Sequence, residues 1–238
     1  MRSRLSFFIL AIIISGCSLS DDNPGISVYS ASFDFSQSLD GWEADFTDLP
    51  SNLDDTSFYE LTFAYTDLPS NLGSKKAIKL SGANHSDDLF MFIKRKISGL
   101  SPNTTYNLVF EVELASNAKK GSVGIGGSPG ESVFLKAGAS EIEPEKVVQN
   151  NQYTLNIDKG NQQASGQNAI TLGDISIPTT AIEYTLITRT NASPYNQTFV
   201  AESNDNGEIW LIIGTDSGFE GTTTVYYTKV NVVFSASN

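Results

Sequence analysis

The sequence has few of the residues that many catalytic sites require. Its 238 residues include one cysteine, Cys17, and one histidine, His85. A single cysteine cannot form an intrachain disulfide, and a single histidine excludes a zinc site built from several histidines. A Ser-His-Asp triad would have to use His85, and the sequence contains no Gly-x-Ser-x-Gly nucleophile motif. These absences argue against the commonest zinc-dependent and serine-dependent hydrolases.

Positive charge is also scarce. The chain has 15 Lys and Arg against 27 Asp and Glu, a formal net charge of −12. Nucleic-acid binding needs clustered basic residues, so no nucleic-acid partner is expected. The same excess of acid disfavours nonspecific attraction to anionic lipid surfaces. Membrane contact is therefore expected only through an anchor.

The N-terminus predicts such an anchor. Arg2 and Arg4 precede an apolar run, residues 5–14, that is too short to cross a membrane comfortably. The run ends in Ile-Ser-Gly-Cys at residues 14–17, which resembles the bacterial lipobox. The resemblance implies a signal peptide over residues 1–16, cleavage before Cys17, and lipid (palmitate among its chains) attached at that cysteine. A signal peptide without lipidation and with a chance cysteine is the alternative.

Residues 17–25 are expected to be the lipidated cysteine and a polar tether. Asp21 and Asp22 resemble the acidic export signal of some surface lipoproteins, and a solvated spacer is the alternative. Cleavage removes two arginines and no acid, so the mature charge becomes −12 − 2 = −14. The expected location is the bacterial cell envelope, anchored in the outer membrane and facing the periplasm or the surface.

The body of the chain has the pattern of an all-β protein. In residues 97–114, Tyr106, Leu108 and Phe110 alternate with polar positions, with Val109 the one apolar exception, as in a half-buried antiparallel strand. About a dozen such runs follow one another between turn residues, with no long helical pattern. We predict an antiparallel β-sandwich of jelly-roll type, formed by a single domain over residues 26–238. Residues 158–168 are polar and are expected to form a long surface loop.

Three pieces of the body resemble jelly-roll carbohydrate-binding modules with a galactose-binding-like fold. They are FSQSLDGW at residues 35–42, the Gly-Leu-x-Pro turn and strand at 97–110, and the closing strand at 225–234. The resemblance implies noncatalytic binding of a glycan. Many members hold a structural calcium with an Asp pair in the closing strand. This chain has Thr228 and Lys229 there, so calcium at that place is not expected.

Aromatic and acidic residues in turns are the candidate ligand-binding groups. Trp42 and Tyr195 are candidate platforms for a sugar ring, whereas Trp210 lies in an apolar run that favours core packing. A repeat, Thr-Asp-Leu-Pro-Ser-Asn-Leu, occurs at residues 47–53 and 66–72. Its Asp48 and Asp67 predict either two similar turns or a paired ligand-binding lip.

The turn around His85 offers the oxygen ligands that calcium prefers. Asn84, Asp87 and Asp88 are the candidate metal ligands, and a plain polar loop is the alternative. No cofactor is otherwise required.

Three functions remain open from the sequence. Glycan binding leads. A structural or assembly lipoprotein that binds a cell-envelope protein is the alternative, and would present a large flat apolar patch. A carbohydrate-active enzyme comes third and would show converging carboxylates with a raised pKa in a cleft.

Overall fold

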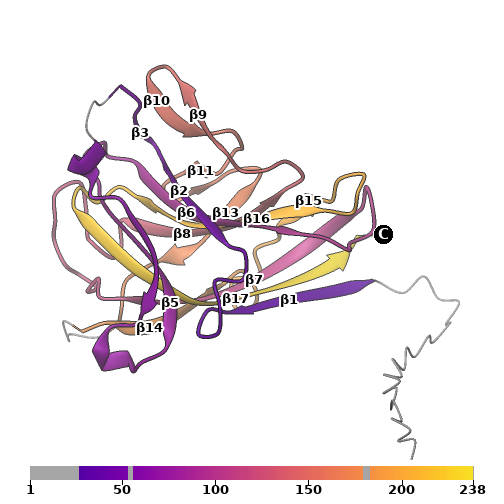
Figure 1. Ribbon diagram of the computed structural model, residues 1–238, viewed down its shortest axis with the longest axis horizontal. Helices are drawn as coiled ribbons and strands as arrows, with labels where there is room; N and C mark the ends of the chain where they lie inside the picture. The colour runs from indigo at the N-terminus through magenta and orange to yellow at the C-terminus, as the bar shows by residue number, and fades with distance from the viewer. Residues whose placement is uncertain (1–26, 53–55, 179–182, 238) are drawn as a thin grey trace, which may run out of the picture.

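The computed structural model describes residues 27–52, 56–178 and 183–237, which form two antiparallel sheets packed face to face (Figure 1). The predicted all-β sandwich of jelly-roll type is confirmed. Cys17, the predicted signal peptide and the whole predicted tether lie outside the described residues. Among the described residues, no helix is long and apolar enough to cross a membrane.

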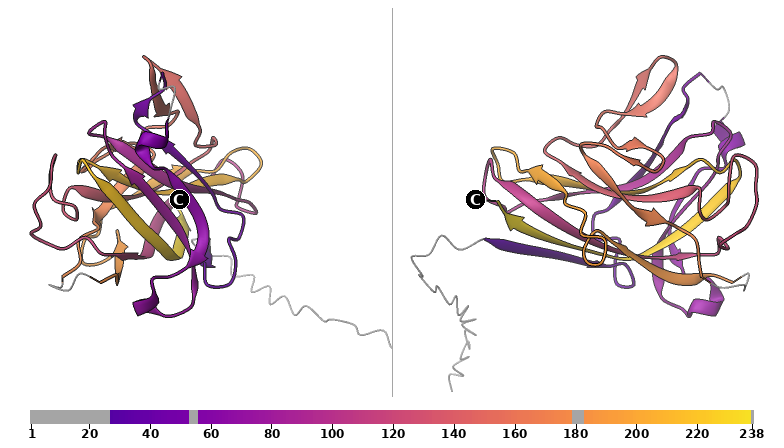
Figure 2. Two further views of the ribbon diagram at one scale, coloured as in Figure 1. Left: turned by 60° about the vertical axis from the view of Figure 1, so that its left-hand side comes forward. Right: turned by 180° about the vertical axis from the view of Figure 1, so that it is seen from behind.

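The seven-stranded sheet contains the first and last strands. Its order is β14-β7-β17-β5-β4, with β1 beside the second half of β17 and β15 beside the start of β7. Val28 pairs with Ser235, so the chain enters and leaves the sandwich at one end (Figures 1 and 2). The strands are β1 (Val28–Asp34), β4 (Thr62–Asp67), β5 (Lys76–Ala83), β7 (Thr105–Ser116), β14 (Thr185–Thr190), β15 (Val200–Glu202) and β17 (Thr222–Ala236).

The five-stranded sheet packs against it in the order β13-β8-β16-β6-β2. Its strands are β2 (Glu43–Thr47), β6 (Leu89–Ile97), β8 (Val133–Ser140), β13 (Ala169–Asp174) and β16 (Ile209–Ser217). The small elements are β3 (Leu49–Pro50), β9 (Lys146–Gln149), β10 (Gln152–Leu155), β11 (Gly160–Asn161), β12 (Ala164–Ser165) and the 3-10 helices η1 (Thr56–Tyr59) and η2 (Ser70–Leu72).

The alternation predicted for residues 97–114 is present in β7. Tyr106, Leu108 and Phe110 are buried in the main core between the sheets, and Asn107 and Glu111 are exposed on the outer face. The alternation of apolar and polar residues specifies the register of β7, because a shift by one residue would move every apolar side chain to the solvent side.

The five-stranded sheet is apolar on its outer face as well. Strand β6 sends Met91 into the main core and Phe90 and Phe92 outward, where the two rings stack with centroids 5.3 Å apart. Leu155 and Ile157 cover them as part of a second, small core. We call residues 141–168, which cross this face, the covering segment. Figure 1 shows its strands β9 and β10 on the side away from the seven-stranded sheet.

The expectation of a long surface loop over residues 158–168 was wrong in part. These residues contain the short β11–β12 pair and a buried lysine, Lys159.

Trp42 does not present a binding surface. Its ring is 1% exposed and packs edge-on against Phe33 and Phe35, with centroids 5.4 and 5.9 Å away. Packing between two rings makes Trp42 a core residue, so the expectation of a sugar platform there does not hold.

We expect Trp42→Ala to lower the free energy of unfolding by about 3–5 kcal/mol, the usual effect of emptying a large aromatic site in a core. Urea denaturation measures this change. A Trp42→Ala protein of unchanged stability that had lost a ligand would contradict the core assignment.

Candidate functional site

The outer face of the five-stranded sheet carries a cluster of buried charged side chains and an aromatic ring. Along β16 the side chains of Trp210, Ile212 and Asp216 point to this face, while Leu211 and Ile213 enter the main core. The covering segment lies over Ile212 and over the Asp216 end. Trp210 stands at the other end of the strand.

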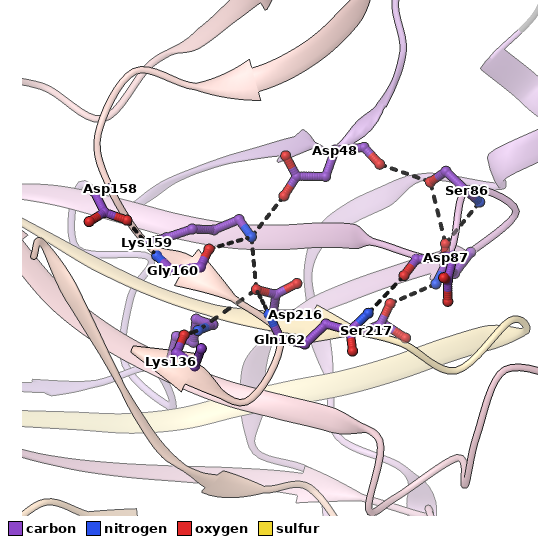
Figure 3. A network of polar contacts seen from close by, with 12 residues as sticks. Asp48, Ser86, Asp87, Lys136, Asp158, Lys159, Gly160, Gln162, Asp216 and Ser217 are labelled. Atoms are coloured by element: carbon purple, nitrogen blue, oxygen red, sulfur yellow. Dashed lines mark hydrogen bonds and ion pairs between the residues drawn. The ribbon is translucent and has the colours of Figure 1, made fainter. Parts of the chain in front are cut away.

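Asp216 is the centre of a buried charge cluster (Figure 3). Its side chain is 0% exposed, and its Oδ2 accepts a hydrogen bond of 2.8 Å from Lys159 Nζ. The same ammonium lies 2.9 Å from Oδ2 of Asp48 and 4.9 Å from the ring centroid of Phe90. Lys159 therefore joins two carboxylates that lie far apart in the sequence.

Further contacts tie the covering segment to this carboxylate. The backbone N–H of Gln162 donates to Oδ2 of Asp216 at 2.9 Å. Lys136, 1% exposed, lies 3.8 Å from that oxygen and donates to the carbonyl of Ala164 at 2.7 Å. The side chain of Gln162 donates to the carbonyl of Asp87 at 3.0 Å. The cluster thus holds residues 159–164 onto the sheet.

Asp88 is a further acidic member of this cluster, and its pKa is raised. Burial raises the pKa of Asp88 to about 7, and the neighbouring Asp216 adds to the rise through its charge and a hydrogen bond. Burial also raises the pKa of Asp48, although Lys159 opposes that rise. A carboxyl beside a buried carboxylate keeps its proton because two adjacent negative charges are unfavourable at low dielectric.

The two lysines differ in how well their charge is compensated. Burial lowers the pKa of Lys159, but Asp216 and Asp48 together outweigh that effect and the pKa is raised. Burial lowers the pKa of Lys136 to about 8, because its carboxylate neighbour is farther away. When Asp88 carries its proton, the two other carboxylates face two ammonium groups, so the charges of the cluster balance.

The carboxylates could hold a metal ion. One oxygen each from Asp48, Asp88 and Asp216 lies within 4.8 Å of the others. Oδ1 of Asp88 and Oδ1 of Asp216 have no hydrogen-bond partner among the described residues. Such oxygens suit a hard cation such as calcium. In this structure, however, the ammonium of Lys159 already supplies a positive charge between two of them.

The structure brings together two of the predicted site residues. Asp48, from the repeat, and Asp88, from the turn around His85, both line a small cavity of about 180 Å³ beside Lys159. The other members, Asp216 and Lys159, were not predicted. Asp216 lies inside an apolar strand and Lys159 inside a polar stretch, so only the pairing of those segments could have revealed them.

The remaining predicted metal ligands have other roles. Asn84 is buried, and its amide donates to the carbonyls of Ser217 and Phe219 while its oxygen accepts from the N–H of Ser86. Asp87 is exposed. Asn84 therefore closes a turn and is not available to the acidic cluster.

The two copies of the repeat do not form a paired lip. Asp48 follows β2 with a positive φ of 63° and faces Lys159. Asp67 ends β4 in the other sheet and pairs with Lys76 at 2.8 Å on the surface. The same residues adopt different conformations because their strands belong to different sheets.

Tyr195 is the predicted aromatic ligand residue that is open to solvent. Its ring is 68% exposed in the turn after β14. A groove of about 410 Å³ lies beside this turn, lined by Val109 and by the amides of Asn107, Asn196 and Gln197.

Trp210, like Trp42, does not lie where the sequence analysis expected it. It is half-buried on the outer face, with Lys94 and Lys96 ammonium groups 5.5 and 5.9 Å from its ring centroid. These lysines pair with Glu143 and Glu208. Its partner across the strands, Ser140, lines a cavity of about 230 Å³. The apolar run around Trp210 hid this position, because both faces of β16 are apolar.

We expect the raised pKa of Asp88 to make stability depend on pH. Between pH 4 and 7 the folded state keeps a proton that the unfolded chain releases, so the contribution of Asp88 to stability falls as pH rises through this range. Asp88→Asn removes this contribution to the slope. Urea unfolding at pH 5 and pH 8 measures the change in unfolding free energy between the two pH values. An identical change in the wild type and in Asp88→Asn would contradict the assignment.

We expect Lys159→Met to destabilise the protein by about 3–5 kcal/mol, because two carboxylates lose their cation. Lys136→Met is the matched control and should have a smaller effect. Calcium should raise the thermal midpoint of Lys159→Met and leave that of the wild type unchanged. An equal response of both proteins to calcium would show that Lys159 does not occupy the cation position.

No protein-family model and no curated protein matches the sequence. Solved structures resemble the chain in fold. A carbohydrate-binding module described for mannan recognition, TmCBM27, is 14% identical over 87% of this chain and 98% of its own, with a TM-score of 0.41. A putative sugar binding protein from Bacteroides thetaiotaomicron is 12% identical over 86% of this chain and 92% of its own, with a TM-score of 0.39. At these identities the likeness concerns the fold alone.

Proposed function

We propose that this protein is a noncatalytic glycan-binding protein whose ligand contacts the five-stranded sheet at its Trp210 end. The observation that carries the proposal is Trp210, an outward-facing ring on the part of the sheet beyond the cluster anchored by Asp216. The CH groups of a sugar pack against an aromatic face, and its hydroxyls need donors and acceptors beside that face. Lys96, Glu208 and Ser140 supply these groups.

We further propose that the protein reaches its ligand from the cell envelope. The lipobox-like residues at 14–17 support a lipid anchor at Cys17, which would remove an otherwise reactive exported thiol. A short polar tether over residues 18–25 would then hold the sandwich close to the outer membrane, on the side where Val28 enters β1. The sandwich needs no calcium in this proposal, because Lys159 supplies the cation for the acidic cluster.

A glycan array probed with residues 18–238, which retain every described residue, tests the binding proposal. We expect Trp210→Ala to weaken binding about tenfold or more, equivalent to about 1.4 kcal/mol. Tyr195→Ala, which removes an exposed ring elsewhere, is the matched control and should leave binding unchanged. Loss of binding only in Tyr195→Ala would move the site to the groove beside β14. A blank array with folded protein would favour a protein partner in the envelope.

One observation favours a second candidate, hydrolysis of a glycosidic bond. Asp88, with a pKa of about 7, and Asp48 both line the small cavity, and paired carboxylates of different pKa are the usual acid and base of such enzymes. The bond from Lys159 to Asp48 and the closed position of Asp216 favour binding over hydrolysis. Release of reducing sugar by the wild type and not by Asp88→Asn would support this candidate.

A further inference from the structure

A separate cavity opens at the end of the sandwich opposite the Val28–Ser235 pair. It has a volume of about 440 Å³, within the range of about 300–1,000 Å³ that is usual for small-molecule sites. We call it the end cavity. It lies where β7 ends and β17 begins, and its lining includes Asn117, Lys119, Ser122, Phe219 and the threonines 222–224.

A glycine-rich loop sets the position of the aromatic ring in this lining. At Gly124 a Cβ atom would come 2.4 Å from the ring of Phe219, and at Gly126 it would come 2.5 Å from the carbonyl oxygen of Gly218. Glu220 donates its N–H to the carbonyl of Ile125 at 2.9 Å. Residues without a side chain are required here because the loop backbone lies directly against the ring and the turn between β16 and β17.

The charge of the end cavity is opposite to that of the protein. The chain has 27 acidic residues and a net charge of −12, yet the lining contains no Asp or Glu. Lys119 is its one charged residue, and among the described residues no carboxylate forms an ion pair with it. In this respect it differs from Lys94, Lys96 and Lys159, each of which faces an acid.

The rest of the lining offers uncharged hydrogen-bonding groups. Thr222, Thr223, Ser122 and Asn117 provide hydroxyls and an amide, whereas the hydroxyl of Thr224 is hydrogen-bonded to Oγ of Ser81 at 2.7 Å. Thr223 is 5% exposed, and its Oγ1 has no hydrogen-bond partner among the described residues. Together with one aromatic ring, these groups match a polyhydroxylated ring better than an apolar ligand.

We propose that the end cavity binds an anionic sugar residue of the uronic acid class. Lys119 pairs with the carboxylate, the hydroxyls of Thr222 and Thr223 and the amide of Asn117 bond to the sugar hydroxyls, and Phe219 packs against its CH groups. The inference shares its ligand class with the proposed function but concerns another site. None of the end-cavity residues lies at Trp210. An experiment that contradicts one proposed site therefore does not contradict the other.

Isothermal titration of residues 18–238 with methyl glucuronide, and with methyl glucoside as the neutral probe, tests the inference at low salt. We expect the glucuronide to bind at least tenfold more tightly than the glucoside, since bonds to a charged group are the stronger ones. Lys119→Gln should abolish this preference and Lys119→Arg should retain it. Lys120→Gln, which makes the same change of charge at the next residue, is the matched control and should have no effect.

NMR chemical-shift mapping locates the bound glucuronide on the protein, whatever its affinity. The glucuronide should perturb Ser122 and residues 222–224 in the wild type. Equal binding of the two probes, equal losses in Lys119→Gln and Lys120→Gln, or shifts confined to the Trp210 end would overturn the inference. An absence of binding by either probe to the folded protein would also overturn it, while leaving array binding through Trp210 unaffected.

Discussion

The arrangement of this protein depends on one buried carboxylate that must find positive partners. Asp216 points away from the main core, to a face where solvent would normally satisfy it, yet it is fully buried. An unpaired charge in such a place would destabilise the fold by several kcal/mol. Lys159 and the N–H of Gln162 satisfy it, and both come from the covering segment. Bringing those residues to Asp216 also brings Leu155 and Ile157 over Phe90 and Phe92.

The polar and apolar contacts on this face therefore act together. The small apolar core excludes water from the charge cluster, which strengthens the bonds to Asp216 and raises the pKa of Asp88. The charge cluster in turn fixes which residues of the covering segment lie on the sheet. Burial of the rings stabilises the segment, and the ion pairs specify its position. Trp210 is half-buried on the same face at the other end of β16, outside the charge cluster, and the glycan contact is proposed there.

Patterns of period two predicted the parts of the fold that a single strand determines. The faces of β7 and the all-β class follow from alternation and turn residues. The candidate site required more, because Asp48 and Asp88 have no reason in sequence to meet Asp216 and Lys159. Both faces of β16 are apolar, so Trp210 looked like a core residue. Trp42 looked open beside Gly41, yet it packs between Phe33 and Phe35. Such positions are set by the pairing of distant segments, which alternation within one strand does not encode.

Native-state hydrogen exchange tests the central role of Asp216 most directly. The amide of Gln162 donates to this buried carboxylate, and the amides of residues 152–155 lie in the segment that the cluster holds in place. The account predicts that these amides exchange as slowly as those of β16, and that Asp216→Asn accelerates them while the amides of β7 and β17 remain protected. Rapid exchange of Gln162 in the wild type, or unchanged protection of the covering segment in Asp216→Asn, would contradict it.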